Sequence, residues 1–175
     1  SIIGEANGSS LSGTNNKTVS IGNVGTVTIK ATLAADQTYI SATKDITLTI
    51  GKATLTATAD DKTRGYGDAN PVFTFSYTGF KNSETATVID TEPTASSTAT
   101  TTTNVGTATI TATGGSDNNY TITTVNGTLT IGKATIIATA EDKTRSYGDA
   151  NPVFTFSYTG FKNSETATVI DTEPT

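Results

Sequence analysis

Four oxygen-bearing side chains near the middle of the chain form the best candidate for a metal site. Asp60 and Asp61 are adjacent, and Asp68 and Asn70 follow within ten residues. Calcium takes about six to eight oxygen ligands, which carboxylate and amide side chains supply. The spacing is not that of an EF-hand, and a solvated turn held by local Asp and Asn backbone bonds explains the same residues. We expect no cofactor, with calcium at these four residues as the alternative.

A second pair of carboxylates could do acid–base chemistry. Asp90 and Glu92 lie two positions apart, which places them on one face of any strand that they share. Paired carboxylates cleave glycosidic bonds when they flank a cleft. Nothing else in the sequence indicates a cleft, and the chain has no His and no Cys, the usual general base and thiol nucleophile. We therefore expect a protein that is not an enzyme.

The most distinctive segment runs from Tyr66 to Pro71 and reads YGDANP; it recurs from Tyr147 to Pro152. One interpretation is a ligand-binding loop in which the tyrosine ring is exposed. The other is a structural corner, in which glycine adopts a special φ, proline ends strand pairing and the tyrosine packs inward. We favour the corner and keep Tyr66 and Tyr147 as the candidate ligand residues.

Composition excludes several classes of partner. Lys and Arg number 11 against 16 Asp and Glu, so the net charge is −5. Nucleic-acid binding requires clustered basic residues, and membrane spanning requires about 18 or more consecutive apolar residues. The sequence has neither, so we expect no nucleic-acid partner and no membrane insertion. It also lacks a signal-peptide pattern at its start, and we expect an interior piece of a secreted or longer chain.

The chain contains a repeat with an offset of 81 residues. Residues 52–94 and 133–175 differ at only four of 43 positions, at Leu55/Ile136, Thr56/Ile137, Asp60/Glu141 and Gly65/Ser146. Residues 14–51 and 95–132 agree at 16 of 38 positions at the same offset. Such identity indicates recent duplication, and repeats of this kind are typical of arrays of domains.

Side-chain alternation suggests where one repeat ends. Leu48 and Ile50 are apolar at even positions, whereas Leu55, Ala57 and Ala59 are apolar at odd positions. Because buried positions in one strand share a parity, the change marks a break in the strand near residues 51–53. The same change recurs near residues 132–134. We predict the closing part of a diverged repeat at 1–51, a complete repeat at 52–132 and the opening part of a near-identical repeat at 133–175.

Strand patterns dominate the sequence. Apolar and polar residues alternate over residues 27–33, 73–78, 107–113 and 120–123, with Thr at many outward positions. We predict an all-β fold with seven or eight short strands per repeat, as tandem small β-sandwich modules, Ig-like or β-grasp-like, in an elongated rod. Asn126-Gly127 predicts a hairpin turn. Little or no helix is expected: only Asn82 to Ala86 could form a short helical turn, with Ser83 as its cap, and five residues are too few for a stable helix. The large aromatic side chains are assigned to the core: Tyr66, Phe73, Phe75, Tyr77, Phe80 and Tyr120.

Residues 52–175 resemble the MBG domain of the YGX type. The shared features are the Tyr66-Gly67-Asp68 and Tyr147-Gly148-Asp149 motifs, each followed by proline, and the closing segment Gly127 to Ile131. Residues 14–51 resemble only the closing half. The resemblance implies tandem repeats in very large bacterial surface proteins, many of them presumed adhesins. It supplies no binding residues that map onto this sequence.

Two functions follow as expectations. The first is a structural stalk of a secreted bacterial adhesin or extracellular filament that projects a distal binding domain and has neighbouring repeats, of the same chain or of a fibre, as its partners. The second is a module with weak affinity for host or matrix glycans, including mucin, in which many copies give avidity. Both place the protein outside the cell, on the bacterial surface. A fibre in which the opening and closing parts at the two ends complete each other between molecules is a further alternative.

Overall fold

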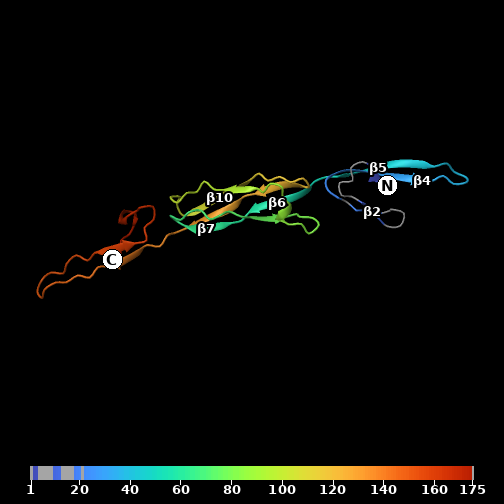
Figure 1. Ribbon diagram of the computed structural model, residues 1–175. Helices are drawn as coiled ribbons and strands as arrows, with labels where there is room; N and C mark the ends of the chain where they lie inside the picture. Colours follow the sequence, from blue (N-terminus) through green and yellow to red (C-terminus); the bar gives the residue numbers. More distant parts are fainter. Residues whose placement is uncertain (1, 4–9, 13–17, 21, 175) are drawn as a thin grey trace. The chain divides into compact units, whose positions relative to one another are not determined.

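The computed structural model describes residues 2–3, 10–12, 18–20 and 22–174. These residues form β-strands and two short 3₁₀ helices, without an α-helix, so the predicted all-β fold is confirmed. The elements are β1 (Ile2–Ile3), β2 (Ser10–Ser12), β3 (Thr18–Ser20), β4 (Gly25–Leu33), β5 (Ala42–Ile50), β6 (Ala53–Ala59), β7 (Lys62–Gly65), β8 (Phe75–Thr78), η2 (Ala86–Val88), β9 (Thr94–Ser96), β10 (Gly106–Thr113), β11 (Tyr120–Val125), β12 (Gly127–Gly132), β13 (Ile137–Ala140), β14 (Phe156–Thr159) and η3 (Ala167–Val169) (Figure 1).

The chain divides into two compact units. Unit 1 comprises residues 1–57, 77–94 and 113–124, and unit 2 comprises residues 58–76, 95–112 and 125–175. This division cuts across residues 52–132, so the repeat boundaries stay a prediction. At the first of them, β5 ends at Ile50 and β6 begins at Ala53, on either side of the predicted change in parity.

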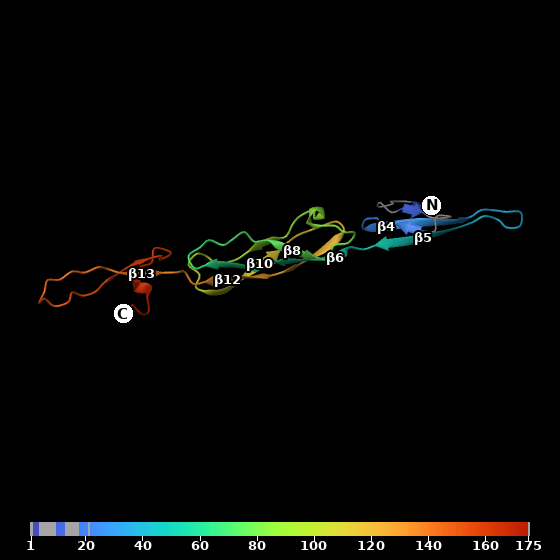
Figure 2. The ribbon, with the colours of Figure 1, turned by 90° about the horizontal axis from the view of Figure 1, so that it is seen from below.

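Unit 1 contains a long hairpin of β4 and β5, which lie side by side (Figure 2). The strands pair in antiparallel fashion from Gly25↔Ile50 to Leu33↔Ala42, and β1 pairs with the outer side of β4. Alternating apolar and Thr residues explain the strands, because β-branched side chains pack well on a pleated surface. Val27 is fully buried, whereas every side chain of β5 before Leu48 is exposed.

Residues 52–132 hold seven strands, as predicted for one repeat. Strands β11, β6 and β8 form one sheet, in that order, and β7, β12, β10 and β9 form another. Within the second sheet β12 runs antiparallel to β10 and parallel to β7. Two sheets of three and four strands fit the content of a small β-sandwich.

The hairpin predicted at Asn126-Gly127 is wrong. Strands β11 and β12 belong to different sheets, so the chain changes sheet at this dipeptide. The Asn126 Oδ1 atom accepts a hydrogen bond from the Ala112 N–H at 2.9 Å. A Cβ atom on Gly127 would lie 2.4 Å from the Ala59 carbonyl oxygen. Glycine is therefore required by close backbone approach rather than by a positive φ.

The segment considered for a short helical turn, residues 82–86, forms a turn of a different kind. Asn82 and Ser83 have positive φ angles of 52° and 61°, which form a tight turn closed by the Glu84 N–H on the Lys81 carbonyl at 2.9 Å. Left-handed residues end a right-handed helix, so Ser83 caps nothing. The 3₁₀ helix η2 begins only at Ala86 and has no side-chain cap.

The buried core of unit 2 consists of small and aliphatic side chains. Tyr66, Phe73 and Phe75 are partly buried and pack against this cluster, and the buried positions belong to Ala59, Ala99, Ile110, Ala112, Leu129 and Ile131. Among the aromatic residues assigned to the core, only Tyr120 is buried. A small module encloses few positions completely, and β8, which carries Phe75 and Tyr77, is an edge strand.

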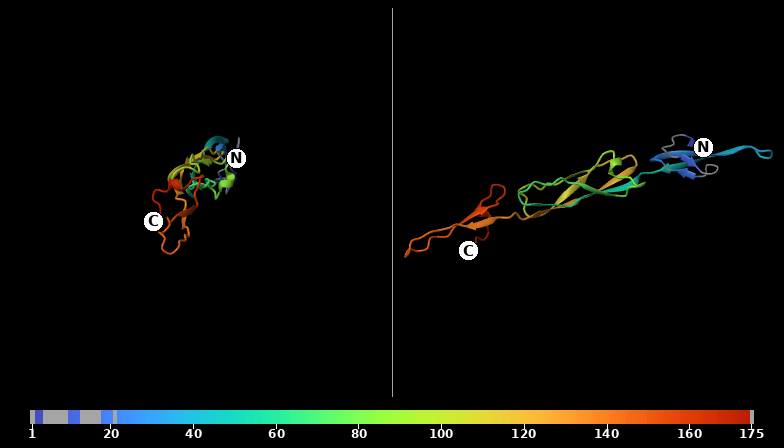
Figure 3. Two further views of the ribbon diagram at one scale, coloured as in Figure 1. Left: turned by 90° about the vertical axis from the view of Figure 1, so that its left-hand side faces the viewer. Right: turned by 60° about the horizontal axis from the view of Figure 1, so that its bottom comes forward.

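The second copy of the repeat segment forms a smaller structure within unit 2. Strands β13 and β14 pair as a hairpin, with Ile137 opposite Thr159 and Ala140 opposite Phe156 (orange to red in Figure 3). Every side chain of β13 is exposed, whereas Leu55, Ala57 and Ala59 of the matching strand β6 are buried. The residues are nearly identical, so the difference lies in what covers them.

Candidate functional site

The four predicted calcium ligands each have a different partner. The Asp60 carboxylate accepts hydrogen bonds from the hydroxyl of Ser76, at 2.6 Å, and from that of Thr74. Both bonds lower the pKa of Asp60, and the bond from Ser76 has the larger effect. Asp61 accepts a bond from the backbone N–H of Thr128 at 2.7 Å. Asp68 accepts a bond from Lys162, and Asn70 is bound to Arg64 and to the Ala99 carbonyl. In the part of the chain that the structure describes, no three acidic side chains gather into one group.

Asn70 holds its loop against a neighbouring segment. Its Oδ1 atom accepts a bond from Arg64 Nε at 2.9 Å, and its Nδ2 atom donates to the Ala99 carbonyl at 2.8 Å. Arg64 also donates to the Thr100 carbonyl at 2.5 Å and to the Gly65 carbonyl at 3.0 Å. The guanidinium offers several donors in a fixed plane, which suits this set of carbonyl partners. Asn70 and Arg64 therefore shape the YGDANP corner.

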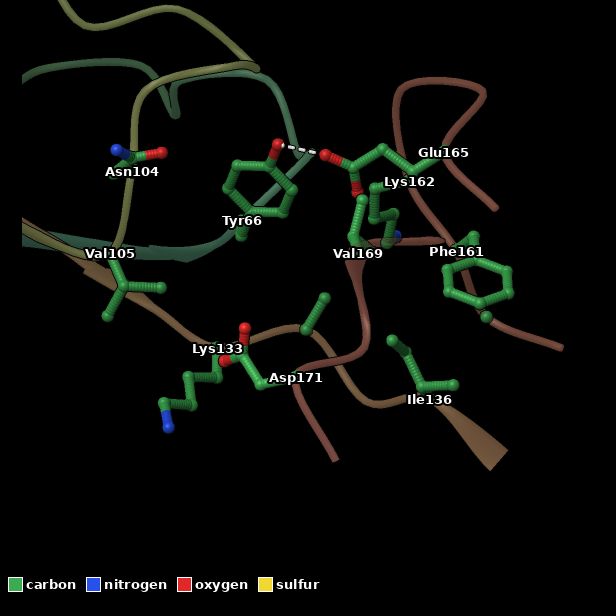
Figure 4. A pocket seen from close by; sticks show the side chains of 12 residues that line it. Tyr66, Asn104, Val105, Lys133, Ile136, Phe161, Lys162, Glu165, Val169 and Asp171 are labelled. Atoms are coloured by element: carbon green, nitrogen blue, oxygen red, sulfur yellow. Dashed lines mark hydrogen bonds between the residues drawn. The ribbon is translucent and has the colours of Figure 1, made fainter. Parts of the chain in front are cut away.

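Tyr66 lies at the rim of a cavity of about 480 Å³ in unit 2. Its hydroxyl donates a hydrogen bond to Oε1 of Glu165, a residue of the second copy, at 2.5 Å (Figure 4). This bond to a carboxylate raises the pKa of the Tyr66 hydroxyl. Asn104 and Val105 line the cavity beside Tyr66, and residues of the second copy, among them Phe161, line the rest.

Two more contacts join the same loop to the second copy. Lys162 Nζ donates to Asp68 Oδ1 at 3.0 Å, and Asn163 Nδ2 donates to the Thr101 carbonyl at 3.1 Å. Gly67, between Tyr66 and Asp68, has a φ of 85°, and a Cβ atom there would lie 2.3 Å from Cβ of Lys162. The motif Tyr66-Gly67-Asp68, which we name the YGD loop, is thus bound by the loop Lys162–Glu165, which we name the KNSE loop.

The other candidate tyrosine is in a different environment. Tyr147 stands at the position of Tyr66 in the second copy, and its side chain is fully exposed. Gly148, at the position of Gly67, has a φ of 90°, and a Cβ atom added there would have nothing within 4 Å. The same loop is thus contacted at one copy and open at the other.

Unit 1 contains the matching KNSE loop, Lys81 to Glu84. Its Glu84 accepts a hydrogen bond from the hydroxyl of Tyr120, which itself accepts one from the Lys81 N–H at 2.8 Å. Nearby, Asn119 Oδ1 accepts a bond from the Val24 N–H at 3.1 Å. Val24 is the equivalent of Val105 at the 81-residue offset, and both line a cavity, here of about 370 Å³.

Glu84, Lys162 and Glu165 were not predicted from the sequence. Two features of the sequence could have indicated them. The KNSE loop recurs exactly, whereas the closing half that contains Tyr120, residues 95–132, follows only the first of the two loops. Of the paired carboxylates Asp90 and Glu92, Asp90 accepts a bond from the backbone N–H of Asn118 at 2.9 Å, across 28 positions of the chain. The arrangement as a whole binds polypeptide to polypeptide.

The Lys162–Asp68 contact predicts a measurable titration. The Lys162 hydrogen bond and charge hold the pKa of Asp68 below its ordinary value of 3.8. The contact therefore stabilises the folded chain above that value, and its contribution is lost as the pH falls through the lower, folded pKa. We expect Lys162→Gln to return the Asp68 pKa toward 3.8, measured by carboxyl-carbon NMR.

The matched control is Lys81→Gln, at the same position of the first copy. This variant should leave the Asp68 titration unchanged. An Asp68 titration that Lys162→Gln does not move would contradict the assigned ion pair.

The described residues include no helix whose length and apolar character would allow it to cross a membrane.

Comparison with known proteins identifies one family. The MBG domain (YGX type) matches residues 55–130 and 136–175, which is most of the chain. No curated protein and no solved structure matches. The matched ranges include the YGD loop, its second copy and both KNSE loops, and domains of this family are typical of extracellular bacterial surface proteins. The chain belongs to the MBG domain family of the YGX type.

Proposed function

We propose that this chain is a structural stalk segment of a secreted bacterial surface adhesin or extracellular filament, and that it projects a distal binding domain. The observation that carries the proposal is the contact between the YGD loop and the KNSE loop of the next copy. Tyr66 and Asp68 are bound by side chains that lie 99 and 94 positions further along the chain. Side-chain contacts between a repeat and its successor restrict the orientations open to the connection between them.

The partners in this proposal are neighbouring repeats of the same chain or of the same protein in a fibre. Surface display suits the chain, because an acidic, Thr-rich surface limits non-specific association of repeated domains. The function requires no bound cofactor and no catalysis, and Tyr66, Asp68 and Asn70 serve as structural residues in it.

Small-angle X-ray scattering tests the stalk. We expect the largest dimension of arrays with added 81-residue repeats to grow by about 30–40 Å for each repeat, as for strands of about ten residues that run lengthwise. Replacing Glu165 with Gln should broaden the distribution of interrepeat distances, and Glu84→Gln is the matched control. A largest dimension that hardly grows as repeats are added would contradict the stalk.

A second function is favoured by one observation, the exposure of Tyr147, and it applies to a repeat whose YGD loop is not bound by a following KNSE loop. An aromatic ring that stands in solvent on a loop can stack on a sugar, and many repeats would convert weak binding into avidity. The full chain applied to a mucin and glycan array, with and without calcium, tests this. Binding that Tyr147→Ala abolishes and Tyr66→Ala leaves intact would support glycan recognition. Silence from folded protein would leave the spacer role.

A further inference from the structure

One glutamate occupies the same place in both copies and has a different partner in each. Glu84 is bound by Tyr120, the first residue of β11 in its own repeat. Glu165 is bound by Tyr66, which lies in the preceding copy. The two glutamates are related by the 81-residue offset, and the residues around them, 80–94 and 161–175, are identical.

The loop that carries this glutamate has one conformation in both copies. Asn82 and Ser83 have φ angles of 52° and 61°, and Asn163 and Ser164 have 51° and 62°. In each loop the glutamate N–H donates to the lysine carbonyl at 2.9 Å. The backbone therefore presents the carboxylate from the same position, whichever tyrosine is present.

The two tyrosines donate to the same kind of acceptor. Tyr120 donates to the carboxylate of Glu84, and Tyr66 donates to the carboxylate of Glu165. An ionised carboxylate accepts several hydrogen bonds, so the two donors do not exclude each other. We propose that, where one complete repeat follows another, this carboxylate bridges two tyrosines: the Tyr120 of its own repeat and the Tyr66 of the repeat before it.

The space for the second tyrosine is present in unit 2. Tyr120 lies edge-to-face with Phe80 in unit 1, with ring centroids 5.7 Å apart. The equivalent ring, Phe161, lines the 480 Å³ cavity together with Ile136 and Val169. Ile136 is 39% exposed, whereas its equivalent Leu55 is 0% exposed. The occupant that fits is a copy of the closing half, residues 95–132, whose Tyr120 meets Phe161 and Glu165.

The bridge couples the folding of one repeat to its contact with the next. Within its own repeat, the carboxylate is bound by the tyrosine of β11, so this bond forms only when β11 is folded. A carboxylate that is already fixed by this bond loses less side-chain entropy when it binds the preceding YGD loop. In an array, this is a nearest-neighbour interaction that adds to the stability of each repeat. The inference rests on the proposed stalk, because it concerns the junction that the stalk repeats.

NMR with ring-labelled tyrosine tests the bridge in two proteins: the full chain, and the full chain extended after Thr175 by a second copy of residues 95–132. We expect the extension to slow amide exchange of β13 and β14 at least tenfold. In the extended chain, Glu165→Gln should lower the pKa of both Tyr66 and the added tyrosine. In the parent chain, which lacks the added tyrosine, Glu165→Gln should lower the pKa of Tyr66. The matched control, Glu84→Gln, should leave the pKa of Tyr66 unchanged.

Three results would overturn the bridge. In the first, extension lowers the Tyr66 pKa to its value in Glu165→Gln, which means that the tyrosines compete for the carboxylate. In the second, the added tyrosine does not respond to Glu165→Gln. In the third, β13 and β14 exchange as fast as before, so the closing half does not dock. None of these alters the scattering test, in which the stalk fails only if added repeats do not lengthen the array.

Discussion

Leu55→Ala is expected to destabilise the first copy of the repeat by about 2–5 kcal/mol, because Leu55 is fully buried and its loss leaves a cavity. The side chain lies in the middle of β6, between β11 and β8 in the sheet order, so the surroundings cannot collapse onto the gap without disturbing two strand pairings. Native-state amide exchange in β6 and β11 measures the effect locally, where a global unfolding midpoint would average over the whole chain.

The chain carries its own control for this substitution. Ile136 occupies the same position in the second copy but is 39% exposed. Ile136→Ala is expected to cost less, about 1–1.5 kcal/mol, because more than a third of the side chain is already in solvent. Equal losses at the two positions would contradict the inference that burial distinguishes the copies.

The strand pattern was predictable from the sequence because it depends on neighbours one and two positions away. Alternation predicted the regions of β4, β8, β10 and β11, and a change in parity indicated the break between β5 and β6. The change of sheet at Asn126-Gly127 was not predictable in this way. The sequence does not distinguish a glycine required for a turn from a glycine required by close approach of a carbonyl oxygen. The Ala59 carbonyl oxygen, 2.4 Å from a Cβ added to Gly127, shows that close approach is the reason here.

The environment of the two tyrosines could not be predicted from local sequence. Tyr66 and Tyr147 stand in identical YGDANP segments, yet one hydroxyl is bound to Glu165 and the other ring is fully exposed. From the sequence, an inward corner and an exposed loop were alternatives for both. The inward corner describes Tyr66, and the exposed loop describes Tyr147. The exposure of the tyrosine depends on whether a KNSE loop lies against its YGD loop.

Gly67→Ala is expected to open the contact between the YGD loop and the KNSE loop, with loss of the Tyr66–Glu165 hydrogen bond and the Lys162–Asp68 ion pair. Gly67 has a φ of 85°, which costs an alanine about 1 kcal/mol. In addition, the new Cβ would lie 2.3 Å from Cβ of Lys162, an atom fixed to the backbone, so no change of rotamer relieves the overlap. The KNSE loop must therefore move away.

Gly148→Ala separates the two effects of the substitution. Gly148 has nearly the same φ, 90°, but nothing lies within 4 Å of the new Cβ, so only the backbone cost remains. We expect Gly67→Ala to lower the Tyr66 pKa as far as Glu165→Gln does, because both remove the bond that raises it. Gly148→Ala should leave the Tyr66 titration at its parent value. If amide exchange shows that each variant disturbs its own YGD loop equally, the glycine serves only the turn. If Gly67→Ala disturbs its loop more than Gly148→Ala does, the glycine also admits the next repeat.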